Sequence, residues 1–107
     1  MRCNFVEDGK MDINEGIKAF KKAEKAVLLD VRREEEFASG YIAGAINIPL
    51  QEIEDITDVV VGKNTLLYVY CRSGVRSAQA VNALRYMGYT NAVDIGGILQ
   101  YKGEIVR

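Results

Sequence analysis

The sequence predicts an α/β domain in which helices cover both faces of a largely parallel sheet, a three-layer α/β/α sandwich. Segments with strand-like and helix-like patterns alternate along the chain, which is typical of this class. The strand-like segments are continuous apolar runs, as expected for strands that are covered on both faces. With 107 residues, 49% of them hydrophobic, the chain has the size of one domain, which we expect to span residues 1–107.

The first half of the chain contributes two predicted strands and three predicted helices. We expect Asn14 to be the N-cap of the first helix, because Glu15 follows in the first turn and Ile17 and Phe20 have helical spacing. The next elements in order are a strand over 26–29 that ends at Asp30, a short helix over 34–38 stopped by Gly40, a strand over 45–48 closed by Pro49, and a helix over 50–58.

The second half contains the clearest strand and the clearest helix. Residues 65–70 are rich in β-forming side chains and end at Cys71. After a loop, Ala78, Val81 and Leu84 form the apolar face of a helix of about three turns, for which Gly88 supplies the stop. A strand over 91–95, the pair Gly96-Gly97 and a short helix over 98–102 complete the predicted elements.

Composition excludes several classes of function. The 14 Lys and Arg against 15 Asp and Glu leave a net charge of −1, so we expect neither nucleic acid nor a membrane as a partner. Because the chain has no histidine, Ser-His-Asp and Cys-His catalysis and His-ligated zinc are excluded. Two cysteines are too few for a disulfide scaffold, and the longest apolar run, 66–71, is too short to span a bilayer. The start of the chain has no apolar signal-peptide core, so we expect a cytoplasmic location.

The loop over residues 71–77, Cys-Arg-Ser-Gly-Val-Arg-Ser, is the candidate site. It joins the carboxyl end of a predicted strand to the start of a helix, where ligands bind in open α/β sheets and where free amides attract anions. Gly74 permits a positive φ, so that successive amides can curl into an anion-binding nest. This setting favours a thiolate at Cys71 without help from histidine.

We therefore expect Cys71 to be the catalytic residue. The residues expected to bind an anionic substrate are Arg72, Ser73, Gly74, Val75, Arg76 and Ser77. The competing interpretation is that Cys71 is a small buried hydrophobe and that the two arginines are solvated surface charges. Cys3 lacks any such surroundings, and we expect it to be an inert thiol.

The loop resembles the active loop of the rhodanese (thiosulfate sulfurtransferase) family, which begins with Cys and ends with Arg five positions later. The resemblance extends to three other segments: Leu28-Leu29-Asp30-Val31-Arg32 followed by Glu36-Phe37, residues 40–49, and Gly96-Gly97 with Tyr101. Two departures are Tyr41, where the family usually has His, and Tyr101, where it usually has Trp. We expect these two substitutions to have modest effects on stability or on the shape of the pocket.

The resemblance implies a single-domain rhodanese-like fold with a five-stranded, largely parallel sheet in the order 3-2-4-5-1. In this order Asp30 and Cys71 end neighbouring strands at the switch point of the sheet. The resemblance suggests that Asp30 and Arg32 support the active loop. The alternative for Arg32 is a salt bridge on the helix side, with Glu34, Glu35 or Glu36.

The activity that the resemblance implies is transfer of a sulfane sulfur through a persulfide on Cys71. The donor would be a small anion such as thiosulfate, or a persulfide, and the acceptor a thiol or a protein; no cofactor or metal is implied. One alternative is a cysteine-dependent phosphatase or arsenate reductase, but the related loops have one more residue than the four between Cys71 and Arg76. A non-catalytic sulfur-carrier or binding module is the other alternative.

Overall fold

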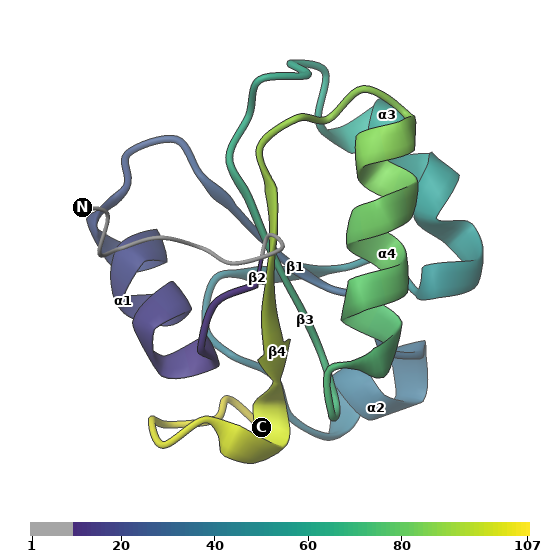
Figure 1. Cartoon of the computed structure of the whole chain (residues 1–107). Helices are drawn as coiled ribbons and strands as arrows, with labels where there is room; N and C mark the ends of the chain where they lie inside the picture. Colours follow the sequence, from purple (N-terminus) through teal and green to yellow (C-terminus); the bar gives the residue numbers. More distant parts are fainter. Residues whose placement is uncertain (1–9) are drawn as a thin grey trace.

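The computed structural model describes residues 10–107. Its sheet has four parallel strands in the order β2-β1-β3-β4 (Figure 1). Their bounds are Val27–Asp30 (β1), Ala45–Asn47 (β2), Leu67–Cys71 (β3) and Ala92–Gly97 (β4). All four strands therefore present their carboxyl ends, Cys71 among them, at one edge of the sheet.

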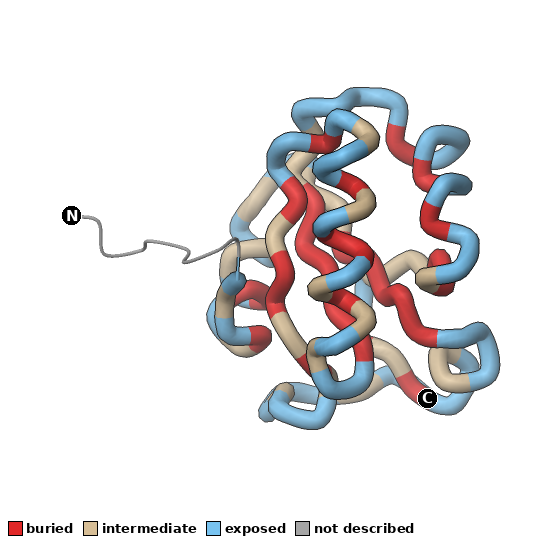
Figure 2. Tube along the Cα trace, turned by 45° about the vertical axis from the view of Figure 1, so that its right-hand side comes forward, coloured by how far each residue is buried: buried red, intermediate tan, exposed pale blue. Residues whose placement is uncertain are grey.

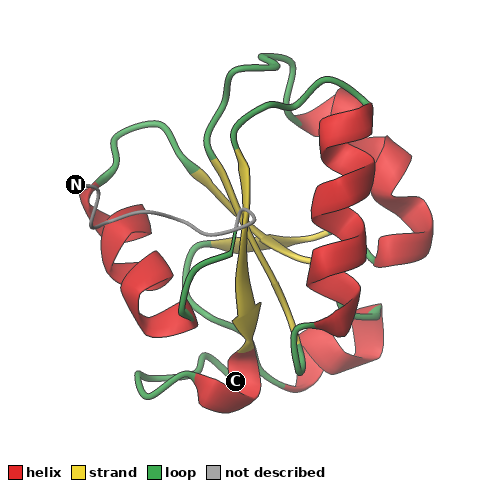
Figure 3. Cartoon of the chain, in the orientation of Figure 1, coloured by secondary structure: helices red, strands yellow, loops and turns green. Residues whose placement is uncertain are grey.

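Helices cover both faces of this sheet, which confirms the three-layer α/β/α architecture (Figure 3). The bounds are α1 Ile13–Lys22, α2 Glu34–Ser39, the 3₁₀ helix η2 Leu50–Asp55, α3 Ile56–Val59, α4 Val75–Tyr86 and the 3₁₀ helix η3 Ile98–Gln100. The helix α1 lies on one face, whereas α2, α3 and α4 lie on the other (Figure 1).

The apolar core is correspondingly divided into two clusters by the sheet. Leu28 faces α1 together with Ile13 and Ile17, while its neighbour Leu29 faces the side of α4. This alternation is what a strand that is covered on both faces produces. The central strand β3 is buried along its whole length. Figure 2 shows that the buried segments gather in the interior of the molecule.

The described residues contain four strands, whereas the resemblance implied five. The observed order matches the four implied strands that follow α1, and the implied first strand would precede α1 at the β4 edge. At that edge Lys10 forms an isolated parallel bridge with Asp94, and the Met11 N–H donates to the Asp94 carbonyl at 2.7 Å. A single bridge does not make a strand, and residues 1–9, including Cys3, lie outside the described part of the chain.

The N-cap of α1 is Asp12, so the prediction of Asn14 was wrong. The Asp12 carboxylate accepts hydrogen bonds from the N–H groups of Asn14 (3.0 Å) and Glu15 (3.2 Å). The Asn14 side chain instead donates to the Gln100 carbonyl at 3.0 Å and accepts from the Lys102 N–H at 2.8 Å. Aspartate and asparagine are equally good N-caps, so contacts distant in sequence decide which residue caps the helix.

The predicted helix over 50–58 is two shorter helices, η2 and α3, with a non-helical Glu52 in the first of them. The helix α4 ends as predicted, with Gly88 at a φ of 102° directly after its C-cap Met87. The predicted helix over 98–102 is a single 3₁₀ turn, η3. Of the helices within residues 10–107, none has the length and apolar character needed to cross a bilayer.

Candidate functional site

Cys71 is the last residue of β3 and exposes none of its surface. Its thiol is free, and its Sγ accepts a hydrogen bond from the Gly74 N–H at 3.0 Å. Gly74 has a φ of 111°, a conformation that is strained for any residue with a Cβ, and directly precedes the first residue of α4. The positive φ predicted for Gly74 is confirmed, and the turn directs the Gly74 N–H, at the start of a helix, toward the sulfur.

The backbone of the loop over residues 71–77 contacts β4 at Gly97, which is paired with Cys71 in the sheet register. A Cβ at position 97 would overlap the Arg72 carbonyl oxygen and would lie 2.6 Å from the Ser73 Cα. The Arg72 carbonyl also accepts a hydrogen bond from the Leu99 N–H at 3.2 Å. The second glycine of the pair thus lets the backbone of the loop lie directly on the neighbouring strand.

Arg76 is the partly buried end of the loop, and its partner is a residue that the sequence did not assign to it. The two terminal nitrogens of Arg76 donate to the two carboxylate oxygens of Glu36 on α2, at 2.7 and 3.1 Å. Hydrogen bonding from Arg76 lowers the pKa of the Glu36 carboxyl to about 2. The same hydrogen bond raises the pKa of Arg76, which stays a cation. Glu36 therefore fixes the orientation of the guanidinium at the edge of the site.

The remaining loop residues divide into an outer and an inner set. Arg72, Ser73 and Val75 are exposed, and within residues 10–107 no salt bridge involves Arg72. Ser77 is fully buried and its Oγ lies 3.5 Å from the Cys71 Sγ. The structure thus brings Gly74 and Ser77 to the sulfur and leaves the side chains of Arg72, Ser73 and Val75 on the surface of the loop. Every role toward a substrate stays a prediction.

Asp30 and Arg32 form a buried ion pair at the end of β1. The Arg32 side chain donates to both carboxylate oxygens of Asp30, with the shortest contact at 2.7 Å, and also to the Gly40 carbonyl at 2.7 Å. Nearby, the Tyr70 hydroxyl accepts from the Ile42 N–H, and burial raises the pKa of this phenol. The alternative of a helix-side salt bridge from Arg32 is wrong, because its ionic partner is Asp30.

This ion pair acts on the segment that follows α2 rather than on the loop directly. Its hydrogen bonds end at Gly40, and the link toward the loop is the backbone bond from the Val31 N–H to the Tyr70 carbonyl, one residue before Cys71. The Tyr41 side chain stacks on Phe37 with ring centroids 4.3 Å apart. Tyr41 therefore occupies its position through packing on α2.

Two acidic residues of the site were not predicted from the sequence: Glu36 as the partner of Arg76 and Asp94 as the partner of Ser77. The Ser77 hydroxyl lies 2.7 Å from Oδ1 of Asp94, which is only 5% exposed. An acidic residue inside an apolar strand was a usable signal for Asp94, because aspartate is rare in buried strands. Glu36 was marked as part of the family resemblance, but nothing in the sequence indicated its pairing with Arg76.

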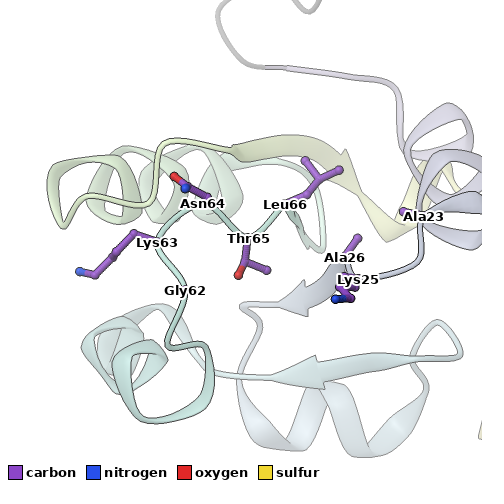
Figure 4. A pocket seen from close by; sticks show the side chains of 8 residues that line it. All are labelled: Ala23, Lys25, Ala26, Gly62, Lys63, Asn64, Thr65 and Leu66. Carbon is purple, nitrogen blue, oxygen red and sulfur yellow. The ribbon is translucent and has the colours of Figure 1, made fainter.

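A cavity of about 440 Å³ lies at the opposite end of the sheet, beside the amino ends of β1 and β3 (Figure 4). Its lining includes Lys25 and Lys63, but the Lys63 Nζ donates to the Met87 carbonyl at 2.7 Å and lies over the Tyr89 ring. Within residues 10–107, no group of three or more Cys, Asp or Glu side chains is arranged to hold a metal ion. The cavity and the active loop are separate features of the fold.

Known proteins are similar to this chain in both sequence and fold. The model of the rhodanese-like domain matches residues 14–104. Thiosulfate sulfurtransferase PspE of Escherichia coli K12 is 42% identical over 71 residues, which are 65% of this chain and 68% of that protein. The structure described as a rhodanese with anions from E. coli has a TM-score of 0.72 and 38% identity, and the match covers 77% of this chain and 98% of that one.

A third relative is much longer than this chain. Adenylyltransferase and sulfurtransferase uba4 of Ogataea parapolymorpha is 35% identical over 105 residues, which are 91% of this chain. The match spans only 27% of the length of that protein. Similarity to uba4 therefore concerns one portion of a larger molecule.

Proposed function

The chain belongs to the rhodanese-like domain family, and on that premise we propose that it transfers a sulfane sulfur through a persulfide on Cys71. The sulfurtransferase names of its relatives support a sulfurtransferase activity in general. The donor in this proposal is thiosulfate or a persulfide, and the acceptor is a thiol, free or on a protein. The observation that carries the proposal is the Cys71 Sγ, held at a strand end by a 3.0 Å hydrogen bond from Gly74.

In the first half-reaction the Cys71 thiolate attacks the outer sulfur of thiosulfate. A bond forms between Sγ and that sulfur, the S–S bond of thiosulfate breaks, and sulfite leaves with the electron pair. In the second half-reaction an acceptor thiolate attacks the outer sulfur of the persulfide. The bond to Sγ breaks, and the electron pair returns to Sγ as the thiolate.

Two arginines supply the positive charge that an anionic donor needs. A guanidinium has five N–H donors, so the two hydrogen bonds from Arg76 to Glu36 leave others to meet the donor. Arg72 is exposed next to Cys71 in the loop, where it can meet the same anion. Because Cys71 exposes no surface, we infer that the outer loop residues shift when a donor approaches.

The proposal is tested by following thiocyanate formation from thiosulfate and cyanide. We expect activity in the wild-type protein and in Cys3→Ser, and loss of at least about a thousandfold in Cys71→Ser, because the nucleophile is removed. The same samples are then incubated with an aryl phosphate. Thiocyanate formation that survives Cys71→Ser, or Cys71-dependent phosphate release without thiocyanate, contradicts the proposal.

A further inference from the structure

A buried carboxylate on β4 is linked to the catalytic sulfur through one hydroxyl group. The Ser77 Oγ, in the first turn of α4, lies 2.7 Å from Asp94 Oδ1 and 3.5 Å from Cys71 Sγ. Cys71 and Ser77 expose no surface, and Asp94 is 5% exposed. Within residues 10–107, no salt bridge compensates the Asp94 charge. The proposed mechanism makes no use of this carboxylate.

The direction of the single hydroxyl proton of Ser77 decides whether Ser77 donates a hydrogen bond to the Cys71 Sγ or accepts one from it. Its possible acceptors are Asp94 Oδ1 at 2.7 Å, the Gly74 carbonyl at 3.0 Å and the Gly96 carbonyl at 3.5 Å. Hydrogen bonds to a carboxylate are shorter and about twice as strong as those between neutral groups. The proton therefore lies toward Asp94, and a lone pair of Oγ faces Sγ. In this arrangement Ser77 accepts a hydrogen bond from the Cys71 thiol.

The backbone keeps Asp94 in place for this interaction. The Gly96 N–H donates to the same Oδ1 at 2.9 Å, within β4 at the irregularity of its register with β3, where Gly96 has a φ of 93°. Asp94 thus has a defined orientation in which it receives hydrogen bonds from two elements of the site.

We propose that Asp94 is a positioning residue that, through Ser77, disfavours negative charge on the Cys71 Sγ. The proposal rests on the sulfur-transfer function and deepens it. In the free protein Asp94 favours the thiol, and after sulfur loading it favours the persulfide, in which Sγ is neutral and the charge lies on the outer sulfur. Asp94 thereby makes the Cys71 thiolate a poorer leaving group and prolongs the time for which the protein holds its sulfur.

The other charged groups around the sulfur either favour negative charge on Sγ, as the arginines do, or are paired with an opposite charge. The Arg76 guanidinium on α4 interacts electrostatically with Cys71, and its charge is shared with Glu36 on α2 and Asp30 on β1. Arg72 lies next to Cys71 in the loop and is exposed to solvent. Because Glu36 and Asp30 each have an arginine partner, Asp94 is the acidic group whose removal changes the balance at the sulfur.

The distance from Asp94 Oδ1 to Ser77 Oγ and the distance from Ser77 Oγ to Cys71 Sγ together put Oδ1 at most about 6 Å from Sγ. With an effective dielectric constant of about 20 to 40, a unit charge at that distance changes the ratio of thiolate to thiol by about 10- to 100-fold. The tenfold change is the expected one, because Arg72 and Ser73 next to Cys71 are exposed and solvent there screens the interaction.

The test is a pH titration of the ultraviolet absorbance of the thiolate, corrected with the matching Cys71→Ser protein. Asp94→Asn keeps an oxygen acceptor for Ser77 and Gly96 but removes the charge. We expect about tenfold more thiolate at a given pH below the midpoint, so that the midpoint falls by about one pH unit. The exposed Asp58→Asn, which changes net charge equally, should leave the midpoint unchanged.

An unchanged midpoint in Asp94→Asn, or a higher one, overturns the proposal, and a higher one shows that Asp94 acts as a base for the thiol. If Asp94→Asn does not fold, Ser77→Ala gives the answer. We expect more thiolate than in the wild type, because the lone pair that faces Sγ is gone; less thiolate means that Ser77 donates to the sulfur, and the proposal is wrong. The titration needs no sulfur donor, so its outcome is independent of whether the protein forms thiocyanate.

Discussion

The pairing of Arg76 with Glu36 predicts a specific loss of stability in Glu36→Gln. Glutamine keeps an oxygen that can accept from the Arg33 N–H, which bonds to Glu36 Oε1 at 2.9 Å, but it loses the charge that pairs with Arg76. The substitution therefore separates the ionic contact between α2 and α4 from the local cap of α2. The matched control is Glu35→Gln, which removes the same charge from an exposed position on the same helix.

The lowered pKa of Glu36 sets the size and the pH range of the effect. The pKa falls from 4.5 to about 2 on folding, mainly through the hydrogen bond from Arg76. A shift of this size corresponds to at most about 3 kcal/mol. Because the side chain of Arg76 is 31% exposed, solvent screening reduces the expected contribution to about 1–2 kcal/mol. Since the pKa is lower in the folded state, the stabilisation is complete above about pH 5 and is lost as the pH falls from there toward 2.

Urea unfolding at a series of pH values measures this contribution. At neutral pH we expect Glu36→Gln to lower the free energy of unfolding by about 1–2 kcal/mol and Glu35→Gln by less than about 0.5 kcal/mol. Near pH 2 we expect the wild type and Glu36→Gln to converge, because protonated Glu36 has no charge to lose. Equal stability of the two proteins at neutral pH, or a difference that persists undiminished near pH 2, would show that the ion pair between Arg76 and Glu36 does not stabilise the fold.

Two further predictions concern the supports of the loop. We expect Gly97→Ala to reduce thiocyanate formation by more than about tenfold while circular dichroism stays unchanged, because its Cβ would overlap the backbone of the loop. The control is Gly62→Ala, whose Cβ would meet only the Thr65 side chain. Equal activity of the two variants would show that the contact at Gly97 does not position the loop. We expect Asp30→Asn to lower the free energy of unfolding by about 3–5 kcal/mol, because it leaves the buried Arg32 charge without its partner. A loss below about 1 kcal/mol, comparable with that of the exposed Asp58→Asn, would show that the ion pair is not a structural support.

The sequence was sufficient to predict the layers of the fold and the position of the loop. Continuous apolar strands predict burial on both faces, and the structure confirms this for Leu28 and Leu29. A glycine at position 74 before a helix predicts a positive φ, and Gly74 has a φ of 111°. Of the successive amides expected to form a nest, the Gly74 N–H donates to Sγ. Both predictions depend on local patterns, which the chain carries within a few residues.

What the sequence did not predict depends on which side chains meet across the fold. The local pattern does not show which of the three consecutive glutamates at 34–36 faces Arg76, and the orientation of α2 in the fold turns the third of them toward it. Asp12 rather than Asn14 caps α1 because a segment near the C-terminus engages the Asn14 side chain. In both cases the deciding partner lies more than 35 residues away, beyond the reach of local patterns.

If Cys71 carries the transferred sulfur, loading with a donor must change the mass of the intact protein. After incubation with thiosulfate and removal of the excess, we expect a gain of one sulfur atom, about 32 Da, that a thiol reductant reverses. The gain should occur in Cys3→Ser and be absent from Cys71→Ser. A wild-type protein that gains no mass, or a sulfur adduct that persists in Cys71→Ser, would contradict the account.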